Sequence, residues 1–209
     1  MLVIIHLFAG ASLHVYSNYL KKTVLIGNIS IALLCAVLPL LVFLFDMPGI
    51  IQTYYDTKGV FLLSNGAKTY NEVFFDIVLN SVLLLSLFVF LVTLIREIIK
   101  DVEDEKGDRQ AGYRTLAVRF GSGLAFHSAI GISIFTIILL FGLMAFYLPI
   151  FFTSKDTLIF ISAAFFVVAL PLLQSIYLGF KRNASSNSKT IKLSMVGAII
   201  LCVIFGILN

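Results

Sequence analysis

VFFDIVLNSVLLLSLFVFLVTLI, residues 73–95, has one charged side chain, Asp76, and is followed directly by REIIKDVEDEKGDRQAGYRTLAVRFG, residues 96–121. A helix needs about 20 apolar residues to cross the hydrocarbon core of a membrane, so the first stretch predicts a transmembrane helix. The second stretch is the most strongly charged part of the chain. It contains three aspartates in the pattern D-x-x-D-x-x-x-D: Asp101, Asp104 and Asp108.

The composition of the whole chain is that of an integral membrane protein. Of its 209 residues, 60% are hydrophobic and only 12% are charged, which lies outside the usual range of soluble domains. We therefore predict an all-α fold, a polytopic membrane bundle that forms a single domain over residues 1–209. Its six transmembrane helices are expected at about residues 1–20, 24–45, 73–95, 120–147, 157–180 and 191–208.

Lysine and arginine are distributed very unevenly between the segments that connect these helices. One side carries only Lys58, Lys68 and Lys155. The other side carries twelve: Lys21, Lys22, Arg96, Lys100, Lys106, Arg109, Arg114, Arg119, Lys181, Arg182, Lys189 and Lys192. The positive-inside rule makes the basic side cytoplasmic, so the Asp-rich loop is predicted to be cytoplasmic and both termini lie on the opposite face. The net charge of +4 follows from this bias and requires no nucleic-acid partner.

The connecting segments differ in character. Residues 46–72 contain several Gly, Pro and Asn residues and predict a long turn-rich loop on the outer side. The short link at 149–156 predicts that the helices before and after it pack as an antiparallel pair. Residues 181–192, KRNASSNSKTIK, are small and polar and predict a solvated linker. Pro39 and Pro171 lie within predicted spans, where each removes one backbone hydrogen bond and favours a kink.

The acidic residues of segment 96–121 are spaced for one face of a helix. If the third helix continues beyond the membrane, four carboxylates project from the same side: Glu97, Asp101, Asp104 and Asp108. Like charges at this spacing repel, and a divalent cation such as Mg²⁺ would reverse that effect by binding carboxylates and substrate phosphate oxygens together. Gly107 and Gly112 should end or bend the helix and fold the following segment back. Spacing alone leaves one alternative open, a solvated loop of mixed charge.

Two segments resemble signatures of the UbiA superfamily of intramembrane prenyltransferases. Residues 96–121 resemble its second aspartate-rich signature, most closely that of geranylgeranylglycerol-phosphate geranylgeranyltransferase-like members. Residues 16–28, YSNYLKKTVLIGN, resemble the family's tyrosine-lysine segment between two helices and the Gly-Asn helix start that follows it. Both segments occur in the expected order and on the same predicted membrane face, and the resemblance extends over essentially the whole chain.

The resemblance implies magnesium-dependent transfer of a polyprenyl group from a polyprenyl diphosphate to a lipophilic acceptor, for which a glycerol-phosphate lipid is one candidate. It implies metal binding by three residues: Asp101, Asp104 and Asp108. It implies substrate binding by five more, the first three as diphosphate contacts and the others as supporting polar groups: Lys21, Lys100, Arg114, Tyr16 and Asn28. It assigns no catalytic residue and leaves the acceptor and the prenyl chain length open.

The chain departs from the family pattern on its amino-terminal side. Members usually have nine helices and a first signature of the form N-D-x-x-D-x-x-x-D on an early helix. This sequence has six predicted helices and no such signature, and its acidic residues before Glu97 are isolated. We therefore expect it to correspond to the C-terminal part of a nine-helix fold, with an N-terminal segment and part of the metal site missing.

The sequence also bears on three other classes of function. A non-catalytic membrane subunit or fragment would keep the carboxylates only to bind a lipid diphosphate or a partner chain. A CDP-alcohol phosphotransferase would need an aspartate-glycine pair and a downstream alanine-arginine, which the segment does not supply in that order. An ion transporter would place its essential charges nearer the bilayer midplane. Consumption of a polyprenyl diphosphate by the chain would distinguish the enzyme hypothesis from the binding-subunit hypothesis.

Overall fold

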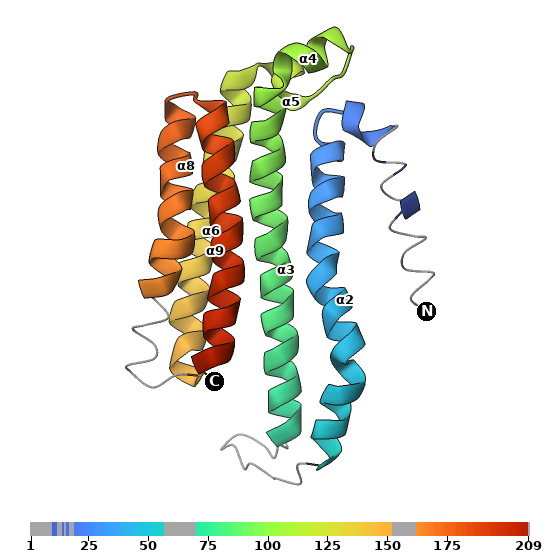
Figure 1. Ribbon diagram of the computed structural model, residues 1–209, viewed down its shortest axis with the longest axis vertical. Helices are drawn as coiled ribbons and strands as arrows, with labels where there is room; N and C mark the ends of the chain where they lie inside the picture. The colour runs from blue at the N-terminus through green and yellow to red at the C-terminus, as the bar shows by residue number, and fades with distance from the viewer. Residues whose placement is uncertain are drawn as a thin grey trace. The chain divides into compact units, whose positions relative to one another are not determined.

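The computed structural model describes residues 10–11, 14, 16, 19–56, 70–151 and 162–208, and the regular secondary structure within these ranges is entirely helical. The all-α prediction is therefore confirmed for this part of the chain. Figure 1 shows the ribbon. The elements in chain order are η1 (Leu20–Lys22), α2 (Ile26–Asp56), α3 (Tyr70–Glu103), α4 (Glu105–Gln110), α5 (Leu116–Phe120), α6 (Ser122–Phe151), η2 (Phe165–Ala169), α8 (Leu170–Phe180) and α9 (Ala184–Leu208).

Four helical segments within the described ranges are long and apolar enough to cross a membrane: Ile26–Gly49, Val82–Glu103, Ser122–Gly142 and Ser162–Phe180. They correspond to the second to fifth predicted spans. The first predicted span, 1–20, lies largely outside the described residues. The sixth, 191–208, falls within α9, which is helical but is not among these four segments. A total of six transmembrane helices stays a prediction.

The chain divides into two compact units. One consists of Met1–Ala32 and Leu91–Asn209, and the other of Leu33–Phe90. The second unit holds most of α2 and the first part of α3. The first unit holds the start of α2, the end of α3 and all later elements, and in it α6, α8 and α9 lie side by side. A single domain over residues 1–209 stays a prediction.

Both ends of the loop expected at 46–72 are helical. Helix α2 continues to Asp56 although Pro48 lies within it, and α3 already begins at Tyr70. The prediction was therefore wrong for residues 46–56 and 70–72, while residues 57–69 lie outside the described ranges. A helix that continues satisfies its own backbone groups, and in an apolar environment this outweighs the single hydrogen bond that a proline removes.

The solvated linker expected at 181–192 is mostly helix. A three-residue turn separates α8 from α9, with Arg182 in the left-handed region at φ 54°. Asn183 then caps α9 by accepting a 3.1 Å hydrogen bond from the Ser186 N–H. Asn187 is buried, and its Oδ1 accepts a 2.5 Å hydrogen bond from the Ser175 hydroxyl of α8. The linker prediction was wrong because these polar side chains find partners inside the helix pair.

Helices α6, α8 and α9 pack closely through small residues. Helix α8 runs antiparallel to α6, as the short link predicted (Figure 1). A Cβ added to Gly179 of α8 would lie 2.9 Å from the Ile130 side chain of α6. The π-helix η2 comes directly before α8, and Pro171 is the second residue of α8. Proline offers no N–H to the carbonyl four residues earlier, so a widened turn at this point is the local consequence of Pro171.

Candidate functional site

The acidic segment continues α3 with almost no interruption. Helix α3 ends at Glu103, and α4 begins at Glu105. Across the junction the Asp104 N–H donates to the Lys100 carbonyl at 2.8 Å, and the Asp108 N–H donates to the Asp104 carbonyl at 3.0 Å. These are helix-type hydrogen bonds, so the predicted extension of the third helix is confirmed in this region.

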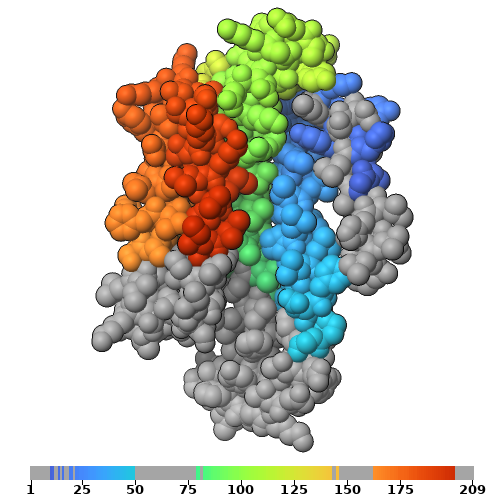
Figure 2. Space-filling view, in the orientation of Figure 1, coloured from blue at the N-terminus to red at the C-terminus, as the bar shows by residue number. Residues whose placement is uncertain are grey.

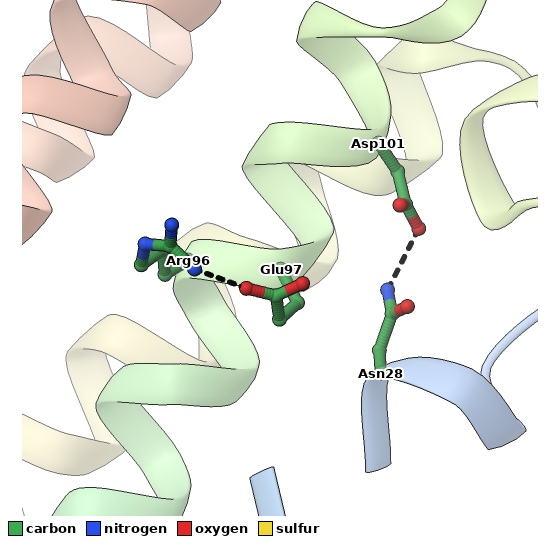
Figure 3. A network of polar contacts seen from close by, with 4 residues as sticks. All are labelled: Asn28, Arg96, Glu97 and Asp101. Carbon is green, nitrogen blue, oxygen red and sulfur yellow. Dashed lines mark hydrogen bonds and ion pairs between the residues drawn. The ribbon is translucent and has the colours of Figure 1, made fainter. Parts of the chain in front are cut away.

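The start of α2 contacts the end of α3 through one hydrogen bond between side chains. The Asn28 amide Nδ2 donates to Asp101 Oδ2 at 2.7 Å (Figure 3). Asn28 is only 6% exposed, and Asp101 is partly buried. The Thr23 hydroxyl supports this start of α2 by accepting a 3.3 Å hydrogen bond from the Gly27 N–H. One carboxylate oxygen of Asp101 is thus fixed by a neutral donor on another helix.

Charged and polar groups gather around this hydrogen bond. The Asp101 carboxylate interacts electrostatically with Asp108, Glu97 and Lys100. The Tyr16 hydroxyl interacts in the same way with Glu97, Asp101 and Arg96. All of these residues belong to one compact unit. We refer to seven residues as the α3 polar cluster: Tyr16, Asn28, Arg96, Glu97, Lys100, Asp101 and Asp108.

The segment after α4 folds back toward residues 16–28, as predicted from Gly112, whereas Gly107 lies inside α4 and does not end the helix. Gly112 has φ 72°, and the Tyr113 N–H donates to the Asp108 carbonyl at 2.8 Å, which is a Schellman-type helix end. The Arg114 N–H then donates to the Lys22 carbonyl at 3.0 Å, so the two sequence motifs are also joined by a backbone contact. In the space-filling view, segment 105–121 gathers where α3 ends (Figure 2).

The structure brings most of the predicted site residues together. Tyr16, Asn28, Lys100, Asp101 and Asp108 belong to the α3 polar cluster. The other three are placed differently. Asp104 and Arg114 are exposed, and Lys21 lies in η1, where its side chain is outside the described part of the structure. Their roles, and those of the clustered residues, stay predictions.

The predicted metal ligands form a looser arrangement than three converging carboxylates. Within the described residues, no group of three or more His, Cys, Asp or Glu side chains is arranged to hold a metal ion. Asp101 and Asp108 nevertheless interact electrostatically. Magnesium needs only one or two protein carboxylates when phosphate oxygens and water complete its coordination. The donor chemistry of this pair therefore fits magnesium.

Two members of the cluster, Arg96 and Glu97, were not among the predicted site residues. Glu97 is 6% exposed and accepts a hydrogen bond from Arg96 Nη1, forming an ion pair between neighbouring residues (Figure 3). The sequence did signal Glu97 as the first carboxylate of the ladder. The sequence did not indicate that Glu97 is buried, because the strongly charged stretch begins at Arg96 and such a stretch is usually exposed to solvent.

Comparison with known proteins identifies the family. The family model of the UbiA prenyltransferase family matches residues 1–196, so the chain belongs to that family. The resemblance drawn from the two motifs is thereby confirmed. No solved structure matches the chain.

The relatives that match the chain share one name, digeranylgeranylglyceryl phosphate synthase. The digeranylgeranylglyceryl phosphate synthase of Hyperthermus butylicus is 37% identical over 120 residues, which cover 57% of this chain and 32% of that protein. The protein of the same name from Methanosphaera stadtmanae is 30% identical over 186 residues, covering 89% of this chain and 56% of that protein. A third, from Methanopyrus kandleri, is 47% identical over 45 residues, or 22% of this chain and 17% of that protein. The matched part of the chain thus spans between 17% and 56% of the length of these three relatives.

Proposed function

We propose that this chain transfers a polyprenyl group from a polyprenyl diphosphate to a glycerol-phosphate lipid. The observation that carries the proposal is the hydrogen bond between Asn28 and Asp101, because it joins the two family motifs at one polar site on the end of an apolar helix. The relatives support the acceptor class, since they are named for a product with two geranylgeranyl groups on glyceryl phosphate.

The reaction that forms such a product adds a second geranylgeranyl group to a glyceryl phosphate lipid that already carries one. The bond between C1 of the prenyl donor and its diphosphate oxygen breaks, and the diphosphate leaves with the electron pair. The acceptor hydroxyl oxygen forms the new bond to C1. In the overall balance, the hydroxyl proton ends on the released diphosphate.

The residues of the chain have three tasks in this proposal. Asn28 orients the Asp101 carboxylate, because its amide holds one of the two oxygens. Lys100, Arg114 and Lys21 neutralise phosphate oxygens through charge-assisted hydrogen bonds. Buried aliphatic side chains of α3, such as Ile95, exclude water from the reacting carbon.

Magnesium is part of the proposal, with Asp101 and Asp108 as ligands and Asp104 as a third. When bound, the metal would stabilise the negative charge that develops on the departing diphosphate. A membrane location with six spanning helices and a cytoplasmic Asp-rich loop also belongs to the proposal. It is supported by the four apolar helical segments and by the uneven distribution of Lys and Arg.

The test is product formation by the full chain reconstituted in lipid vesicles. Geranylgeranyl diphosphate, geranylgeranylglyceryl phosphate and MgCl₂ are supplied, and the product is detected by mass spectrometry. We expect a product heavier than the acceptor by one geranylgeranyl group. Binding of geranylgeranyl diphosphate without any product would contradict the enzyme and favour the non-catalytic subunit. Absence of both would contradict the site itself.

A further inference from the structure

We propose that Thr93 and Glu97 of α3 form the binding site for the hydroxyl group of the acceptor, so that the site selects an alcohol. This inference rests on the proposed prenyl transfer and names the group that recognises its second substrate. The two residues are four positions apart on one helix, and Asp101 follows after another four. Residues at this spacing lie on the same face, about 6 Å apart along the helix axis.

Thr93 carries a buried hydroxyl group with an unused hydrogen-bonding capacity. The residue is 3% exposed, and its Oγ1 has no hydrogen-bond partner among the described residues. Buried threonines in helices normally donate to the carbonyl one turn earlier, as Thr136 does to Ile132 at 2.7 Å. An unsatisfied buried hydroxyl destabilises the folded protein. A bound ligand that supplies the missing hydrogen-bond partner would explain why this hydroxyl is buried.

Glu97 is a charged residue inside a segment that is apolar enough to cross a membrane, Val82–Glu103. It lies near the charged end of this segment, yet it is only 6% exposed, and a charged residue is rarely buried to this extent unless it is paired. One Glu97 oxygen is bound by Arg96, and the other is directed away from Arg96, toward the side of the view on which Asn28 and Asp101 lie (Figure 3). The ion pair therefore compensates the buried charge and leaves one oxygen for a donor.

The chemistry of the pair matches an alcohol. A carboxylate accepts hydrogen bonds only, whereas a threonine hydroxyl can donate one. An acceptor hydroxyl lying between them would donate to Glu97 and accept from Thr93. Side chains four residues apart on a helix have Cβ atoms about 5–6 Å apart, a spacing that a single oxygen at hydrogen-bond distance from both can bridge.

The position along α3 fits the order of the reacting groups. The diphosphate is proposed to bind at Asp101, near the end of the helix. Glu97 and Thr93 lie one and two turns further into the apolar segment, where the prenyl C1 must enter from the diphosphate. The attacking oxygen has to come within about 3–3.5 Å of that carbon. A hydroxyl held between Thr93 and Glu97 would approach from the apolar side.

The experiment measures the KM for the acceptor and the KM for the prenyl donor separately. It compares Thr93→Val with wild type, each as the full chain in lipid vesicles. Valine keeps the shape and removes the hydroxyl. Loss of one hydrogen bond of about 1 kcal/mol should raise the KM for geranylgeranylglyceryl phosphate about fivefold, with the KM for geranylgeranyl diphosphate unchanged. Thr93→Ser should restore the wild-type value. Thr136→Val is the matched control, since its hydroxyl is satisfied within its own helix, and it should leave both KM values unchanged.

A second readout separates ligand binding from a structural role. Because Thr93→Val removes an unsatisfied hydroxyl, the protein without ligand should be as stable as the wild type or more stable. A structural role would instead lower its thermal unfolding midpoint and leave the acceptor KM unchanged, which would overturn the proposal. Glu97→Gln, which keeps the size of the side chain, should also weaken binding of the acceptor and leave binding of the prenyl donor unchanged.

Failure of this inference can be told apart from failure of the proposed function. If no transfer is detected, equilibrium binding of radiolabelled geranylgeranylglyceryl phosphate replaces the KM measurement. Weaker binding by Thr93→Val than by wild type would then still support the acceptor site. Equal binding by wild type, Thr93→Val and Glu97→Gln would overturn it, whether or not transfer occurs.

Discussion

The amide Nδ2 of Asn28 donates a 2.7 Å hydrogen bond to Oδ2 of Asp101, a residue 73 positions later in the chain. This contact places the first turn of α2 against the last turns of α3. It connects a neutral, buried amide with the first aspartate of the acidic segment, and it leaves the second carboxylate oxygen of Asp101 for other partners. The proposed diphosphate site depends on this relationship more than on any other single contact.

Replacement of Asn28 by Leu should impair the site without changing its charge. The Asp101 carboxylate would lose a donor, and hydrogen bonds to charged groups contribute about 1.5–3 kcal/mol. Since 1.4 kcal/mol corresponds to a factor of ten, kcat/KM for geranylgeranyl diphosphate should fall at least about tenfold. Steady-state kinetics in lipid vesicles measure this change.

The matched control for this variant is Ser30→Ala, two residues later in α2. The Ser30 hydroxyl donates within its own helix, to the Ile26 carbonyl at 2.6 Å. Its removal should change kcat/KM by less than about twofold, which corresponds to about 0.4 kcal/mol. Equal effects of Asn28→Leu and Ser30→Ala would show that the Asn28 amide does not orient Asp101.

Gly112→Ala should destabilise the turn that folds residues 112–121 back toward residues 16–28. Gly112 has φ 72°, and an L-residue with a side chain in this region costs about 1–2 kcal/mol. Gly107→Ala is the control, because this glycine lies inside α4 without a positive φ and no atom lies within 4 Å of an added Cβ. There alanine should be neutral or stabilising by about 1 kcal/mol.

Hydrogen exchange of the Tyr113 and Arg114 amides measures this effect locally. Both N–H groups donate hydrogen bonds across the turn, to Asp108 and Lys22. Their exchange should become faster in Gly112→Ala and stay slow in Gly107→Ala. Unchanged protection in Gly112→Ala would mean that the turn does not require the left-handed conformation.

Gly197→Ala should separate α9 from the π-helix η2. A Cβ at this position would lie 1.9 Å from the Val167 carbonyl oxygen, far inside van der Waals contact. Overpacking of this kind typically costs about 1–3 kcal/mol, and a clash with backbone cannot be relieved by a rotamer change. The nearby Ser194 hydroxyl, which donates to the Val168 carbonyl at 3.2 Å, should lose its partner as the helices move apart.

The unfolding midpoint of the purified protein in detergent tests this prediction. Gly131→Ala on α6 is the control, since no atom lies within 4 Å of its added Cβ. The midpoint should fall in Gly197→Ala and stay near the wild-type value in Gly131→Ala. A midpoint unchanged in both would contradict the close approach of α9 to η2.

Much of the fold could be predicted from the sequence because it depends on local properties. Continuous apolar stretches indicated the helices, and the spacing of the carboxylates indicated that α3 continues beyond its apolar part. Gly112 indicated where that helix ends. Each of these features is determined by neighbours within one or two helical turns, so the sequence contains the necessary information.

The errors and omissions concern partners that are distant in the sequence. Residues 184–192 looked like a solvated linker because they are polar, and the burial of Asn187 depends on Ser175 of the preceding helix. The contact between Asn28 and Asp101 depends on how two helices align, which spacing within one segment does not determine. The burial of Thr93 and Glu97 likewise depends on what packs against α3. The family resemblance placed the two motifs in one site but did not identify the contact between them.

The end of α3 is proposed to be a magnesium-dependent prenyl diphosphate site built on Asp101. The most direct measurement is the dependence of prenyl transfer on magnesium concentration for wild type, Asp101→Asn and Glu105→Gln. The last variant is an acid-to-amide change at a residue that forms an ion pair with exposed Arg109. We predict that Asp101→Asn requires at least about tenfold more magnesium for half-maximal activity, or is inactive, because the charged ligand is lost. Glu105→Gln should follow the wild-type curve. Coincident magnesium curves for wild type and Asp101→Asn would contradict the claim.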